Sequence, residues 1–123
     1  MKIFLQRSFD AGHWLGNPSK DAIWNCDTFG KCQNQHGHCW KVQVECVGNV
    51  NSETGMVANF NEIKEIIDQF DHKVVNDFVK LPTAENIVTY IIDKLQEKNL
   101  FSYIRVRINE TENAYAEDEW RSK

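Results

Sequence analysis

Two segments in which apolar and polar residues alternate constrain the fold of this chain most strongly. In residues 2–13, one parity carries Ile3, Leu5, Phe9, Ala11 and His13, with Arg7 as the exception. In residues 38–48, one parity carries His38, Trp40, Val42, Val44 and Cys46. A period of two indicates strands that bury one face. Each buried row therefore includes a histidine at one end of its strand.

The pattern further along the chain predicts two helices and two more strands. Residues 61–70 place Ile63, Ile66, Ile67 and Phe70 along one helical face. A second helix is predicted to begin after Thr83, which is in the N-cap position, and to end by Asn99. Strands are predicted at 103–111 and 114–117, and the acidic tail that follows is expected to fray.

The order of these elements is β-β-α-α-β-β, which predicts an α+β fold. In such a fold both helices cover one face of a four-stranded antiparallel sheet. Residues 16–30 show no sustained period and are predicted to form a loop. Because long loops inside compact domains usually serve a function, and this one leads directly to Cys32, it is expected to border a site.

Composition restricts the class of protein. A chain of 123 residues is expected to form a single domain spanning 1–123. Its formal net charge of -4, without a basic cluster, gives no electrostatic reason for nucleic-acid binding. No apolar run approaches membrane-spanning length, and the N-terminus lacks a secretory pattern, so a cytoplasmic protein is expected. The four cysteines, Cys26, Cys32, Cys39 and Cys46, are then expected to be reduced thiols.

The window from Cys32 to His38 carries the most chemically active side chains. His36 and His38 lie on the same face of an extended strand, with Gly37 between them. Two imidazoles on one face can chelate one metal ion, and neutral imidazole suits zinc. A tetrahedral ion needs at least one further protein ligand, and His13 is the best candidate.

Simpler interpretations stand beside this one. The two histidines could merely pack, and Cys32 could be a buried structural thiol. A structural zinc site could instead use Cys26, Cys32, His36 and His38, but it leaves His13 and Glu110 unexplained. Glu110 extends the apolar row of strand 103–111, where a carboxylate is costly unless something pairs with it.

Six motifs, in order along nearly the whole chain, resemble those of one family. They are Phe9-Asp10-Ala11-Gly12-His13, Cys32-x-x-x-His36-Gly37-His38, Gly55-Met56-Val57-Ala58-Asn59-Phe60, Asp71-His72, Pro82-Thr83-Ala84-Glu85-Asn86 and Glu110-Thr111. The chain resembles the 6-pyruvoyl-tetrahydropterin synthase / 6-carboxy-tetrahydropterin synthase family. That resemblance implies a tunnelling fold (T-fold), in which trimers close their sheets into a barrel and two trimers stack into a homohexamer. It also implies a zinc enzyme that acts on 7,8-dihydroneopterin triphosphate at subunit interfaces.

The resemblance implies a role for each matching residue. The zinc ligands would be His13, His36 and His38, and the fourth position would stay open for substrate. Cys32 would be the general base, with its thiolate favoured by the nearby cation and a histidine partner.

Four further residues take implied roles around the pterin substrate. Asp71 and His72 would complete a Cys-His-Asp relay from a neighbouring subunit, although the pair could instead only cap a helix C-terminus. Glu110 would anchor the pterin ring by accepting its N–H groups. Thr83 would be a second pterin contact, besides serving as an N-cap.

Two reactions compete within the family. One releases triphosphate and forms 6-pyruvoyl-tetrahydropterin, toward biopterin. The other also releases acetaldehyde and forms 6-carboxy-tetrahydropterin, toward queuosine. The three-residue gap between Cys32 and His36 favours the carboxy branch, whereas Phe29-Gly30-Lys31-Cys32 and Asn59 resemble the pyruvoyl branch. A different class of hypothesis is a non-catalytic pterin-binding T-fold oligomer.

Overall fold

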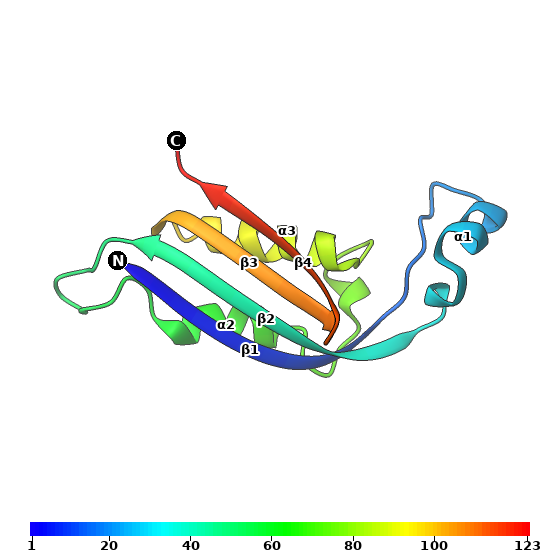
Figure 1. Ribbon diagram of the computed structural model, residues 1–123, viewed down its shortest axis with the longest axis horizontal. Coiled ribbons are helices and arrows are strands. Elements are labelled where there is room, and N and C mark those ends of the chain that lie inside the picture. Colours follow the sequence, from blue (N-terminus) through cyan, green and yellow to red (C-terminus); the bar gives the residue numbers. More distant parts are fainter.

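The computed structural model describes residues 1–123 as one sheet with helices on one face and a helical excursion beyond its end (Figure 1). The elements are β1 (Lys2–His13), α1 (Ala22–Phe29), η1 (Gly30–Gln33), β2 (His36–Gly48), α2 (Phe60–Asp68), η2 (Val75–Asp77), α3 (Ala84–Gln96), β3 (Phe101–Thr111) and β4 (Ala114–Arg121). The four strands are antiparallel in the order β1-β2-β3-β4. The predicted α+β arrangement is confirmed.

The alternating strands bury the rows that the sequence predicts. Phe9 is paired with Trp40 across β1 and β2, and both lie in a core of 22 buried hydrophobic residues. Trp40 satisfies its indole N–H by donating to the carbonyl of Ala11 at 3.1 Å. β2 begins at His36 rather than His38, because the ladder continues until His36 pairs with His13 at the end of β1.

Helices α2 and α3 cover the buried face of the sheet. In α2, Ile63 and Ile67 are buried, and the predicted 61–70 helix ends slightly earlier, at Asp68. In α3, the Thr83 hydroxyl accepts from the backbone N–H of Asn86 at 3.2 Å, which confirms the predicted N-cap. None of the helices is both long and apolar enough to cross a membrane.

The loop predicted for residues 16–30 is wrong in its second half, where α1 forms. Asp21 caps this helix by accepting from the N–H of Trp24 at 2.8 Å, and Gly30 ends it with a positive φ of 53°. No residue of α1 is buried, so the helix has no apolar stripe that a periodicity argument could detect. Its only sequence signals were the two capping residues.

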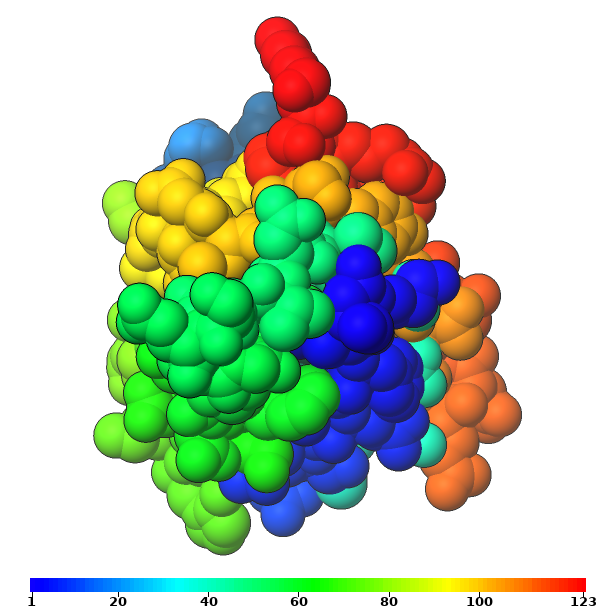
Figure 2. Space-filling view, turned by 90° about the vertical axis from the view of Figure 1, so that its left-hand side faces the viewer, coloured from blue at the N-terminus to red at the C-terminus, as the bar shows by residue number.

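The frayed tail predicted after residue 117 is also wrong, because β4 continues to Arg121. Cross-strand contacts hold this extension: Tyr103 donates to Glu119 at 2.8 Å, and the partly buried Trp120 packs against the hydrophobic core. Figure 2 views the molecule from the end where β1 begins, and the last residues (red) project at the top.

Candidate metal centre and active site

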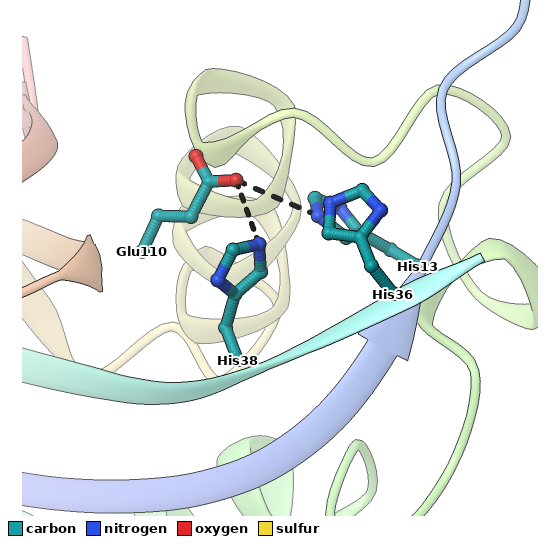
Figure 3. A group of neighbouring side chains, drawn as sticks. All are labelled: His13, His36, His38 and Glu110. Atoms are coloured by element: carbon teal, nitrogen blue, oxygen red, sulfur yellow. Dashed lines mark ion pairs between the residues drawn. The ribbon is translucent and has the colours of Figure 1, made fainter. Parts of the chain in front are cut away.

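Three imidazoles from two neighbouring strands converge at one end of the sheet (Figure 3). The β1–β2 register sets His13 opposite His36, and Ala11 opposite His38, so all three rings project from the same face. Their ring centroids lie 4.5 to 5.1 Å apart. Glu110, from the end of β3, completes a group whose potential ligand atoms all lie within 4.8 Å of one another. The predicted convergence of His13 with His36 and His38 is confirmed.

Backbone carbonyls fix the tautomer of two of these histidines. The Nδ1 atom of His13 lies 2.8 Å from the carbonyl of Pro82, and that of His36 lies 2.7 Å from the carbonyl of Asn34. A carbonyl oxygen can only accept, so each Nδ1 carries the proton and donates it. The Nε2 atoms of the neutral rings are therefore left with free lone pairs, which is the state that binds a metal.

The Nε2 atoms of His13 and His38 are buried and have no hydrogen-bond partner. Oε1 of Glu110 lies 3.5 Å from Nε2 of His13 and 3.1 Å from Nε2 of His38, but neither nitrogen forms a hydrogen bond with it. Buried polar atoms normally find a partner. A cation bound by these lone pairs would satisfy both buried nitrogens, so the residues fit a metal ion.

Burial keeps these rings uncharged. Desolvation lowers the pKa of His13, against the hydrogen bond to the Pro82 carbonyl, which raises it. Desolvation also lowers the pKa of His38, against the nearby charge of Glu110. Both rings are consequently neutral, and ready to bind a metal, at neutral pH.

These lowered pKa values predict how the stability of the metal-free protein depends on pH. The unfolded chain takes up protons on these two histidines near their ordinary pKa of 6.5, before the folded chain does. Stability is therefore full above 6.5 and falls as pH drops from 6.5 toward the lowered folded-state values. Urea unfolding of chelator-treated protein at pH 7.5 and pH 5.5 should show the loss, and His13→Gln should reduce it. An unchanged midpoint would contradict the burial argument.

Cys32 is not part of this group. It sits half-buried in the turn η1, whose position is fixed by a hydrogen bond from the N–H of Leu15 to the Cys32 carbonyl at 2.8 Å. Neither Cys32 nor Cys26 belongs to a cluster of potential ligand atoms, and Cys26 is exposed on α1. The structural zinc site built on both cysteines is therefore not assembled. All four cysteines are free, as expected.

Asp71 and His72 form a second group together with Asp10 on β1. One carboxylate oxygen of Asp71 accepts from the N–H of Asp10 at 2.9 Å, and the other lies 3.0 Å from Nδ1 of His72. The first of these contacts, helped by the second, lowers the pKa of Asp71. His72 has a left-handed φ of 59° and a side chain that is 79% exposed. The C-cap of α2 is Gln69, so the pair is not the helix cap.

Hydrogen bonds to the backbone of β1 hold the segment of Asp71 and His72 in place. The N–H of His72 donates to the carbonyl of Asp10 at 2.6 Å, and the N–H of Gly12 donates to the carbonyl of Lys73 at 3.0 Å. The side chain of Arg7, the exception in the apolar row, donates two hydrogen bonds of 2.8 and 2.7 Å to the carboxylate of Asp68, three residues before Asp71. The sequence gives no sign of these main-chain contacts, because they depend on no side-chain type.

The remaining predicted site residues have clear positions. Glu110 is 32% exposed at its side chain, and Figure 3 shows its carboxylate directed at the histidines from β3. The unprotonated Nε2 atoms of His13 and His38 offer this carboxylate no hydrogen-bond donor, so Glu110 still lacks the partner that a carboxylate on this apolar row needs. The hydroxyl of Thr83 is engaged as the cap of α3, which defines one structural task for this residue.

The four-stranded antiparallel sheet, its two covering helices and the histidine cluster together define a T-fold protein with a candidate metal site. The match to a family model, 6-pyruvoyl tetrahydropterin synthase, extends over residues 2–119, and the chain belongs to that family of tetrahydropterin synthases.

Individual relatives agree with this assignment. The chain is 43% identical over 121 residues to the "Putative 6-carboxy-5,6,7,8-tetrahydropterin synthase" of Archaeoglobus fulgidus, covering 95% of this chain and 94% of the other. It is 37% identical over 124 residues to the 6-pyruvoyl tetrahydrobiopterin synthase of Drosophila melanogaster, covering 88% and 74%. The solved structure of Caenorhabditis elegans 6-pyruvoyl tetrahydropterin synthase superposes with a TM-score of 0.76 at 25% identity, over 100% of this chain and 96% of that one. These matches confirm the predicted family and the T-fold.

Proposed function

We propose that this chain is a zinc-dependent 6-carboxy-5,6,7,8-tetrahydropterin synthase, a lyase that converts 7,8-dihydroneopterin triphosphate and water to 6-carboxy-tetrahydropterin, acetaldehyde and triphosphate. The observation that carries the proposal is the set of three converging imidazoles, two with unpartnered buried Nε2 atoms facing Glu110. Three protein ligands with an open fourth position is the pattern of catalytic rather than structural zinc. The carboxy branch is supported by the Archaeoglobus fulgidus relative and by the short gap between Cys32 and His36.

In this proposal His13, His36 and His38 hold the zinc ion. When bound, zinc supplies Lewis acidity that eases proton loss at the substrate carbon beside a hydroxyl. The carbonyls of Pro82 and Asn34 orient the His13 and His36 rings, which is the task of outer partners in metal sites.

The proposed base is Cys32, whose thiolate form accepts the proton from the substrate. Asp71 keeps one proton on Nδ1 of His72, so that Nε2 of His72 is free to exchange a proton with the thiol. Because the His72 side chain is largely exposed within its own chain, it is available to a site on a neighbouring subunit. We therefore also propose, from the family to which the chain belongs, that the working assembly is a homohexamer of single-domain T-fold chains.

Glu110 is the proposed anchor of the pterin ring. Its carboxylate accepts hydrogen bonds, and a pterin donates them from its amino and ring N–H groups. Binding of such a donor would offset the cost of a partly buried carboxylate. Thr83 is proposed as a second, weaker pterin contact close to His13, through the Pro82 carbonyl that holds His13.

The second candidate is the pyruvoyl reaction, in which triphosphate leaves but the side-chain carbons remain. It is favoured by the Drosophila melanogaster relative and by Asn59 and the Phe29–Cys32 motif. In the structure Asn59 caps α2 by accepting from the N–H of Asn61 at 2.9 Å, a task that Asp performs equally well. Asn59 therefore discriminates weakly between the two branches, and the carboxy reaction is preferred.

A product assay tests this proposal. Zinc-loaded protein incubated with 7,8-dihydroneopterin triphosphate is expected to yield 6-carboxy-tetrahydropterin by mass spectrometry, with acetaldehyde in equal amount. Formation of 6-pyruvoyl-tetrahydropterin without acetaldehyde would establish the second candidate instead. If the substrate binds to the protein but is recovered unchanged, both reactions are contradicted. The protein would then be a non-catalytic pterin-binding oligomer.

A further inference from the structure

A cavity of about 520 Å³ lies between α1 with the segment before it and the stretch from η2 to Lys80. Its lining includes Trp14, Lys20, Asn25, Gln33, Asn76 and Lys80. None of the residues assigned above to metal binding, proton transfer or pterin binding lines it. The cavity is therefore a feature that the proposed chemistry has not used.

The ionisable residues that line this cavity are all basic. Lys20 and Lys80 are its only ionisable lining residues, and no aspartate or glutamate lines it. Neither lysine forms an ion pair, and the one cation contact is Lys20 Nζ at 5.4 Å from the centre of the Trp24 ring. In a chain with 18 acidic and 14 basic residues, two unpaired lysines facing one hollow favour an anionic ligand.

The walls of the cavity are held in place by their own amides. Asn25 accepts from the N–H of Asn17 at 2.7 Å and donates to the carbonyls of the 17–21 segment. Asn76 accepts from the N–H of Trp14 at 3.0 Å and donates to its carbonyl at 2.9 Å. Because the amides of Asn25 and Asn76 are already engaged, the charged donors that a ligand would meet are the two ammonium groups.

Three wall residues connect the cavity to the candidate active site. Trp14 follows the metal-site residue His13, Gln33 follows Cys32, and Lys80 is two residues before Pro82, whose carbonyl holds His13. In Figure 3, Glu110 lies on one side of the imidazoles, and the chain leaves His13 on the other side. A ligand anchored at Glu110 and extended across the imidazoles would therefore direct its far end toward this cavity.

We infer that the cavity binds the triphosphate group of the substrate, with Lys20 and Lys80 as its cationic contacts. The inference rests on the proposed function, since it identifies the part of the site that holds the leaving group of 7,8-dihydroneopterin triphosphate. Lysine suits this task because its ammonium is a compact charge with three donors that can follow a flexible polyphosphate.

Titration with inorganic triphosphate tests the inference in zinc-loaded protein. Lys20→Ala combined with Lys80→Ala is expected to weaken triphosphate binding about tenfold or more, since each charge-assisted contact is lost outright. The matched control combines Lys64→Ala, on α2, with Lys123→Ala, which removes the same charge away from the cavity. Any chelation of zinc by triphosphate is common to all three proteins, so differences in affinity report the cavity.

A second measurement separates this inference from the proposed function. The double variant should raise KM for 7,8-dihydroneopterin triphosphate by about tenfold or more, while its affinity for dihydroneopterin without phosphates stays near that of the wild type. If the wild-type protein forms no product, the proposed function fails, and the triphosphate titration still decides the cavity. Equal triphosphate affinity in the double variant and the control would overturn the inference even if product forms.

Discussion

Replacing His13 by alanine is expected to remove both the bound zinc and the turnover. His13 is fully buried, its ring is fixed by Pro82, and its free Nε2 is one of three converging donors. Outer-shell changes alone cost about 10- to 100-fold in metal affinity or activity, so loss of a ligand should exceed roughly 100-fold. Zinc content by plasma mass spectrometry, with activity in the same sample, measures both effects.

Two further variants distinguish the loss of a zinc ligand from a general loss of the folded structure. His36→Ala removes a second ligand at a less buried position and should give the same loss of zinc. His72→Ala removes an exposed imidazole outside the three-histidine group and should keep the zinc. A His13→Ala protein that retains one zinc ion per chain would contradict the assignment of His13.

Replacing Cys32 by alanine is expected to separate turnover from metal binding. The thiol is not among the clustered ligand atoms, so zinc and assembly should remain. Removing a general base typically costs about 10²- to 10⁴-fold, and kcat should fall by that amount. Steady-state rates on protein with measured zinc content provide the test.

Cys26→Ala is the matched control for this loss. Cys26 is also a free thiol six residues earlier, but it is exposed on α1. This variant should turn over like the wild type. A Cys32→Ala protein with the wild-type rate would show that Cys32 is not the base. A slow Cys26→Ala protein would show that the role belongs to Cys26 instead.

Much of the fold could be predicted from the sequence, because apolar and polar residues alternate clearly along the strands. Trp40, Val42 and Val44 define a buried row that could be read directly, and the rows of β1 and β2 lead to the histidines. Once both strands are antiparallel neighbours, their register brings His13 beside His36. The histidine cluster was therefore predictable from periodicity together with residue type.

Features that do not depend on burial were harder to predict. Helix α1 buries no residue, and in β4 from Asp118 to Arg121 only Trp120 is partly buried, while Glu119 forms a polar contact with Tyr103. The carbonyls of Pro82 and Asn34, which fix the histidine tautomers, belong to the main chain and leave no signature in residue type. Propensity and pattern detect packing, whereas these features rest on individual hydrogen bonds.

The central claim is that three histidines, and no cysteine, hold the metal of this protein. X-ray absorption at the zinc edge of the zinc-loaded protein tests it most directly. The expected spectrum shows nitrogen and oxygen neighbours at about 2.0–2.1 Å with the scattering of three imidazoles. A sulfur neighbour at about 2.3 Å, or fewer than three imidazoles, would contradict the account.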